Sequence, residues 1–169
     1  MLCDIKNISS SPDKGNLIGL IDEWYQISSS QSIVTTPSQF FKFMAGWVAI
    51  NAIYNLMCSE GKGDRKKVIL FSKVDIVRDR HINLIENKCE YISAVKLLKE
   101  KGVLNLTTNR PTNIEDINNF TDVLLCVYQV RNNLFHGGKV PSSTRDEEVV
   151  QASLVIVNKH LEKLLDLVQ

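Results

Sequence analysis

Glycine-rich loops, paired cysteines and an excess of charge of one sign are all missing from this 169-residue sequence. No G-x-G-x-x-G, P-loop or G-x-S-x-G motif occurs, which excludes the usual dinucleotide, nucleoside-triphosphatase and serine-hydrolase sites. The net charge of +1 gives the chain as a whole no polyanion-binding character, so any nucleic-acid site must come from local clusters. The first residues lack the apolar run of a signal peptide, so we expect no secretory leader.

Cysteine and histidine are sparse and scattered. There are four cysteines, Cys3, Cys58, Cys89 and Cys126. They form no C-x-x-C pair, and three of the four fall in apolar helical patterns. We therefore expect reduced, structural cysteines in a cytoplasmic protein. His81 and His160 have no Cys, Asp or His partner at metal-ligand spacing, so we expect no metal site and no cofactor.

Long uninterrupted hydrophobic runs are also missing. The most apolar stretch, residues 40–58, has about the length of a membrane span but contains three polar residues, Lys42, Asn51 and Asn55. This composition favours the central helix of a bundle over a membrane segment, with Trp47 and Tyr54 as core residues.

Helical periodicity dominates what is present, and no convincing run alternates with period two. The spacing of apolar residues predicts helices over 12–28, 35–58, 64–101, 113–136 and 149–168, with one break in the third left open near 81–87. Gly102 and the pair Gly137 and Gly138 are expected to end helices, and residues 103–106 to be briefly extended. The fold class predicted is all-α: a single up-down helical bundle of about five helices. Residues 1–169 would form one domain, with residues 1–11 a loose N-terminal extension.

One helical stripe contains an arginine where the pattern calls for an apolar residue. Arg131 shares its face with Leu124, Val127, Tyr128, Leu134 and Phe135. His136 follows at the predicted helix end, about 7.5 Å along the axis and roughly 140° around it. The two side chains would meet if Gly137 unwinds the last turn, or if a second copy of the helix crosses at a two-fold axis.

Arginine and histidine together suit one kind of reaction. Arginine stays protonated and can clamp a phosphate while charge builds on its oxygens. Histidine titrates near neutrality and can move a proton in either direction. The pair suits attack by a ribose 2′-hydroxyl on the adjacent phosphodiester, which needs no metal and restricts the substrate to RNA. The alternative is structural: a salt bridge for Arg131 and a capping role for His136.

The segment RNNLFH, with its R-x4-H spacing and the asparagine after the arginine, resembles the HEPN superfamily of helical-bundle proteins. The upstream FFKFMAGWVAINAIYN is similar to the aromatic-rich helix of several HEPN families. The resemblance implies a metal-independent endoribonuclease, a homodimer, often a toxin or defence effector with a nucleotidyltransferase-type antitoxin as a possible partner. Carried over, Arg131 and His136 are catalytic and Asn132 orients the histidine or the substrate. Because some relatives only bind RNA or nucleotides, a non-catalytic binding module or a dimerisation domain is the alternative.

Further polar residues are candidates around this motif. Asn51 either supports Arg131 and His136 or is a core amide bonded to helix-end backbone. Lys139 and Arg145 follow the motif closely and are candidates for RNA phosphates. Arg78 and Arg80 belong to a basic stretch, residues 61–81, that fits either an RNA-binding flank or a solvated helix face.

Overall fold

The structure, a computed structural model, describes residues 14–29, 36–58, 63–135 and 144–168. Within these ranges the chain forms seven helices and one short hairpin, so the predicted all-α fold class is confirmed. The helices are α2 (Lys14–Ser29), α3 (Thr36–Met57), α4 (Asp64–Ser72), α5 (Asp75–Asn87), α6 (Cys89–Lys101), α7 (Phe120–Phe135) and α8 (Thr144–Val168). The hairpin consists of β1 (Val103–Asn105) and β2 (Arg110–Thr112).

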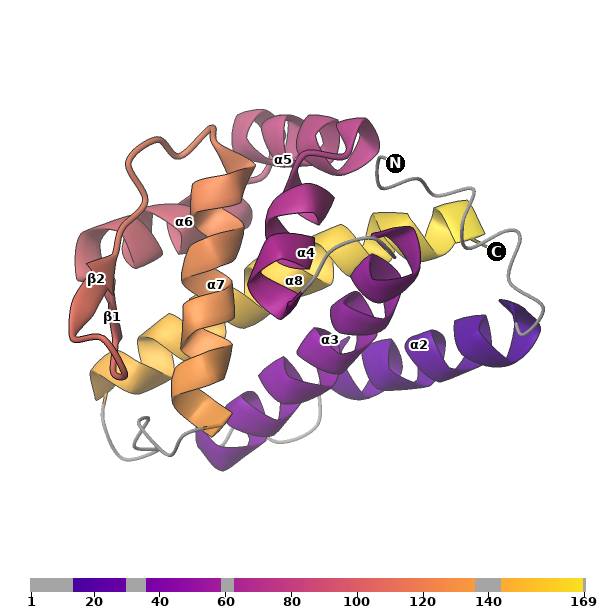
Figure 1. Cartoon of the computed structure of the whole chain (residues 1–169), viewed down its shortest axis with the longest axis horizontal. Coiled ribbons are helices and arrows are strands. Elements are labelled where there is room, and N and C mark those ends of the chain that lie inside the picture. The colour runs from indigo at the N-terminus through magenta and orange to yellow at the C-terminus, as the bar shows by residue number, and fades with distance from the viewer. Residues whose placement is uncertain (1–13, 30–35, 59–62, 136–143, 169) are drawn as a thin grey trace.

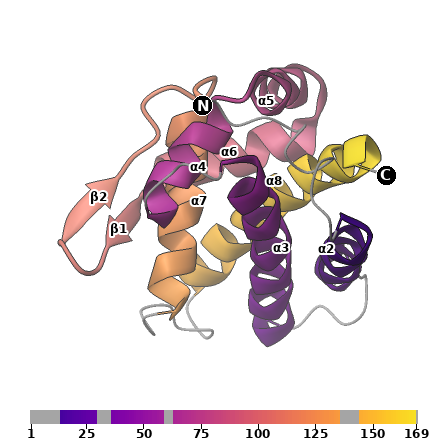
Figure 2. The same ribbon diagram turned by 45° about the vertical axis from the view of Figure 1, so that its right-hand side comes forward.

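Helix α8 is the element on which most of the others pack. Helices α2 and α3 lie side by side along one flank of α8, and α6 packs against its other flank (Figures 1 and 2). Helix α7 packs on α4 and on the hairpin, which projects beyond it at the edge of the molecule. The largest fully buried aromatic side chains come from four helices, so the core is continuous across these contacts: Phe43, Trp47, Tyr54, Phe71, Tyr91 and Phe120.

The stretch predicted as one helix over 64–101 is three helices, and the predicted total of about five is therefore wrong. The chain turns at Val74, which has extended backbone angles, and again at Lys88, one residue beyond the break left open near 81–87. Neither turn contains glycine or proline. The first follows Ser72, whose buried hydroxyl lies 2.8 Å from that of Thr121 on α7. Packing between helices, which periodicity within one helix cannot reveal, sets this boundary.

Helix α7 starts seven residues later than predicted, at Phe120 rather than Asn113. The side chain of Asn119 accepts a hydrogen bond from the N–H of Thr121 at 3.0 Å, as an N-cap residue does. Asp116 binds the N–H of Asn118 at 2.9 Å in a turn of its own. Because the side chains of Asp116 and Asn119 bind these backbone N–H groups, residues 116–119 form a turn and the helix begins only after them.

The hairpin confirms the short extended piece expected at 103–106. Gly102 ends α6 with φ +60°, a conformation that favours glycine, and Val103 then pairs with Thr112 in antiparallel register. On α7, Asn133 donates a hydrogen bond of 2.7 Å to the carbonyl of Leu104, which attaches the hairpin to the helix.

Among the described cysteines, Cys58 departs from expectation. Cys89 and Cys126 are free, whereas Cys58 is disulfide-bonded, so the prediction of four reduced thiols is wrong for Cys58. The spacing argument considered only cysteines close in sequence, while a disulfide requires closeness in space. Burial raises the pKa of the free Cys126 thiol to about 12, which makes it inert. Across the described ranges, no helix combines the length and apolarity that crossing a bilayer requires.

Candidate functional site

The site expected from the sequence lies on the last turns of α7, where the helix leaves the core. The buried face of α7 contains Val123, Val127 and Val130, whereas Arg131 is half-buried at its edge. One turn further on, Phe135 is 57% exposed. The stripe identified in the sequence therefore begins in the core at Leu124 and ends at the surface, and Arg131 stands at the transition.

Neutral and aromatic groups hold the guanidinium of Arg131. Its Nη1 donates a hydrogen bond of 2.9 Å to Oδ1 of Asn132, and its central carbon lies 4.2 Å from the centroid of the Phe135 ring. The second contact is a cation–π interaction. Its Nε is buried without a hydrogen-bond partner, and no described carboxylate forms an ion pair with it. The structure thus places Asn132 against Arg131 itself, and the positive charge of the arginine is not neutralised by any described residue.

Aromatic residues of α3 pack beside this turn. The ring of Trp47 lies 6.0 Å from that of Tyr128 and 6.2 Å from that of Tyr54, centroid to centroid. Both α3 residues are fully buried, as predicted for core positions. Burial, together with the Asp64 carboxylate, raises the pKa of Tyr54, and the charge of Arg131 opposes this shift. Neither Trp47 Nε1 nor the Tyr54 hydroxyl has a hydrogen-bond partner among the described residues. This aromatic cluster therefore contains polar atoms without partners as well as apolar surface.

Asn51 takes part in a different set of contacts. Its Oδ1 accepts a hydrogen bond from Nδ2 of Asn55, whose own Oδ1 accepts one of 2.8 Å from Lys67 Nζ on α4. The structure therefore links Asn51 to a lysine of α4, and no hydrogen bond joins it to Arg131. The expected support of Arg131 by Asn51 is not among these contacts.

The basic candidates are dispersed. Arg78 is exposed and pairs with Asp75 and Asp79, while Arg80 donates to the carbonyl of Lys159. Both belong to α5, which packs near the start of α7, at the end opposite to Arg131 (Figures 1 and 2). Arg145 is exposed and donates to the carbonyls of Lys101 and Gly102. His136 and Lys139 lie outside the described residues.

A buried polar network was missed in the sequence. His81 Nε2 lies 2.8 Å from the carbonyl of Ile117, His81 Nδ1 lies 2.7 Å from the Tyr91 hydroxyl, and that hydroxyl lies 3.0 Å from His160 Nε2. A carbonyl only accepts, so His81 donates through Nε2, Tyr91 donates to His81, and His160 donates to Tyr91. In the sequence, the two histidines were considered only as possible metal ligands. They stand 79 positions apart, so the sequence gives no sign that they share one network.

Within the described ranges, no group of three or more His, Cys, Asp or Glu side chains is placed to hold a metal ion. Burial lowers the pKa of both His81 and His160, so neutral rings fit the donor order of the network.

No protein-family model, curated protein or solved structure matches this chain. What the fold and contacts define is a helical-bundle protein with an arginine, not neutralised by any described residue, at the end of one core helix.

Proposed function

We propose that this chain is a metal-independent endoribonuclease, which cleaves RNA through attack of a 2′-hydroxyl on the adjacent phosphodiester. Arg131 would bind the phosphate and stabilise the charge that builds on its oxygens, and His136 would transfer the proton. The observation that carries the proposal is the state of Arg131: half-buried, held by Asn132 and Phe135, and without a carboxylate partner in the described part of the chain.

This state suits phosphate chemistry better than a structural role. An arginine kept for stability normally pairs with a carboxylate, because a desolvated charge is costly without one. An arginine that must stabilise transition-state charge should instead be fixed in place and left without an anion. The buried rings of Trp47 and Tyr54 lower the local dielectric constant and so strengthen attraction to a phosphate.

A homodimer is part of the proposal. Phe135 exposes more than half of its surface directly beside the Arg131 guanidinium. A second copy packed across a two-fold axis would cover this ring and bring a second arginine close to the first. By family analogy, a role as toxin or defence effector with a nucleotidyltransferase-type antitoxin is proposed, and growth arrest on expression tests it.

The decisive experiment is RNA cleavage in EDTA. Mixed RNA is incubated with the purified protein, and the product ends are analysed. We expect 2′,3′-cyclic phosphates, with a rate loss of about 10²- to 10³-fold in Arg131→Ala and about 10²- to 10⁴-fold in His136→Ala. Arg110→Ala, which removes an exposed arginine from the hairpin, is the matched control and should cleave like the wild type.

Three outcomes separate the alternatives. Full activity in the Arg131→Ala, His136→Ala double variant would contradict the proposal. RNA binding without product, weakened by Arg131→Ala and not by His136→Ala, would replace it with a non-catalytic RNA- or nucleotide-binding module. Loss of dimerisation or stability in Arg131→Ala, with no effect on RNA, would indicate a dimerisation domain.

A further inference from the structure

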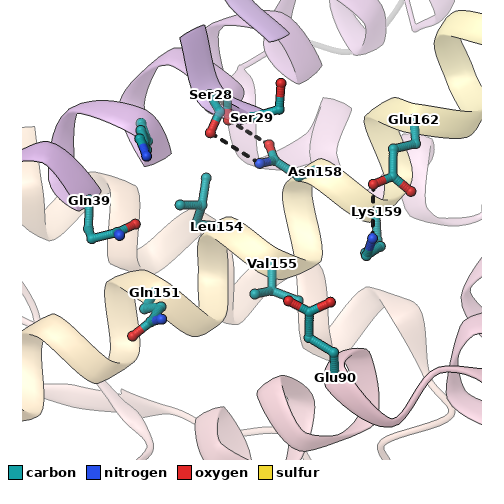
Figure 3. Close-up of a pocket in the computed structure, with 11 residues that line it drawn as sticks. Ser28, Ser29, Gln39, Glu90, Gln151, Leu154, Val155, Asn158, Lys159 and Glu162 are labelled. Atoms are coloured by element: carbon teal, nitrogen blue, oxygen red, sulfur yellow. Dashed lines mark hydrogen bonds and ion pairs between the residues drawn. The ribbon is translucent and has the colours of Figure 1, made fainter. Parts of the chain in front are cut away.

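A polar cavity lies away from Arg131, between one face of α8 and the ends of three other helices. Its volume is about 620 Å³, within the range of small-molecule sites in proteins. The end of α2 contributes Ser28, the start of α3 contributes Gln39 and Lys42, and the start of α6 contributes Glu90. Figure 3 shows Ser28, Gln39 and Glu90 around the α8 face, with Glu90 at the far side of the cavity from Gln39. We call this cavity the Lys42 pocket.

Lys42 is the unusual member of the lining. Only 7% of its surface is exposed, yet it forms no hydrogen bond and no ion pair with any residue that the structure describes. Its Nζ is not among the fully buried atoms that lack a partner, so the stem is buried while the ammonium stays accessible from the cavity that the side chain lines. An anion inside that cavity can therefore pair with it.

The other charges of the pocket leave Lys42 as the available cation. Lys159 Nζ pairs with Glu162 at 2.9 Å, so these two neutralise each other. Glu90 is exposed on α6 and needs no partner besides water. An entering anion would therefore be attracted to Lys42 and repelled by Glu90. These two charges together determine the orientation of the anion in the pocket.

The wall beside Lys42 is already ordered. Ser28 Oγ donates a hydrogen bond of 2.5 Å to Asn158 Oδ1, and Asn158 Nδ2 donates one of 3.3 Å to the Ser28 carbonyl. Gly46, one turn after Lys42, permits this contact, since a Cβ there would lie 2.6 Å from Ser28 Oγ. Gln39, on the same face of α3 as Lys42, has an amide without a described partner and can bind a polar group of the ligand.

We propose that the Lys42 pocket binds a small organic anion, a carboxylate or a phosphate monoester, whose acidic group pairs with Lys42 Nζ. The amides of Gln39 and Gln151 would bind its hydroxyl or amide groups, and Leu154 would contact its carbon skeleton. This site is independent of RNA cleavage, because none of its lining residues belongs to the α7 site.

Calorimetric titration of the full chain tests the proposal with three probes: succinate, glycerol 3-phosphate and inorganic phosphate. We expect at least one to bind the wild type, and the pattern among the three distinguishes carboxylate from phosphate recognition. Lys42→Met keeps the shape of the side chain and removes the charge, so binding should weaken about 10- to 100-fold. Lys96→Met, the same change at an exposed position of α6, should bind like the wild type.

A second measurement uses the unaltered protein, so that the proposal can be tested even if Lys42→Met does not fold. Reductive methylation of lysines, mapped by mass spectrometry, should slow at Lys42 and not at Lys96 when the binding probe is present. Binding by none of the three probes, or equal affinity in the wild type and Lys42→Met, would overturn the proposal. Equal methylation of Lys42 with and without the probe would overturn it as well.

Discussion

Two polar residues near the end of α7 show how strongly a shift of two positions changes a side chain's surroundings. Arg131 lies at the edge of the buried face, with part of its guanidinium open to solvent. Asn133 is buried, and both ends of its amide are used: it accepts from Gln129 at 2.8 Å and donates to Leu104 at 2.7 Å. The Asn133 amide, whose hydrogen bonds are all made within the protein, is structural. The Arg131 guanidinium can still form hydrogen bonds to a ligand, and we therefore assign Asn133 to the scaffold and Arg131 to the candidate site.

Two glycines in helices should respond in opposite ways to the same substitution. Gly46→Ala places a methyl group 2.6 Å from Ser28 Oγ and 3.0 Å from Val157 Cγ1, so we expect a loss of about 1–3 kcal/mol in the free energy of unfolding. Gly19→Ala meets nothing within 4 Å and should gain up to about 1 kcal/mol from helix propensity. Urea unfolding of both variants measures the difference. Equal stabilities would show that α3 does not approach α2 and α8 as closely as described.

At the scale of elements, Asn133 is the link between α7 and the hairpin. Asn133→Ala leaves the Leu104 carbonyl and the Gln129 amide without partners, so we expect a loss of about 1–3 kcal/mol. Asn83→Ala, at an exposed position of α5, is the matched control and should change stability by about 0.5 kcal/mol or less. Denaturant unfolding gives the stability, and amide hydrogen exchange should show faster opening of residues 103–112. Unchanged exchange there in Asn133→Ala would contradict this attachment.

Helices could be predicted from the sequence where local chemistry decides their ends, and not where packing does. Gly102 ended α6 as expected, because its positive φ is a local requirement. The turn at Val74 was missed, since it depends on the contact of α4 with α7. The same limit applies to sites: Arg131 interrupts a pattern on its own helix, whereas Lys42 is notable only once α3 is packed against α8. The sequence showed Lys42 merely as an interruption in an apolar stretch.

At the scale of the whole molecule, the network of His81, Tyr91 and His160 joins elements that are distant in the chain. It connects α5, α6 and α8, and through Ile117 it reaches the loop before α7. Phe120 stacks on His160, with ring centroids 4.2 Å apart, which keeps water from the rings. A proton added to His81 Nδ1 would remove the acceptor for the Tyr91 hydroxyl, and a proton added to His160 Nδ1, which is buried without a partner, would place an unpaired charge among these helices.

Stability should therefore depend on pH in a definite direction. Burial lowers the pKa of His81, partly offset by its bond to Ile117 and by Asp116; burial, His81 and Arg80 lower the pKa of His160. A lowered folded-state pKa means that the unfolded chain binds more protons below pH 6.5, the ordinary histidine value. The stabilisation is complete above that pH and is lost as the pH falls toward the folded-state values.

The test compares the wild type with a variant that keeps the geometry and removes one titrating group. His160→Gln retains an N–H donor for Tyr91, so the slope of unfolding free energy against pH below 6.5 should decrease by about 1.4 kcal/mol per pH unit. Denaturant unfolding from pH 7.5 to 5 measures both slopes, and carboxylates contribute equally to the two proteins. Parallel slopes would mean that His160 is protonated alike in the folded and unfolded chains and contributes no pH dependence. A shallower slope in the variant would instead identify acidification below pH 6.5 as a way to loosen the contacts among α5, α6 and α8.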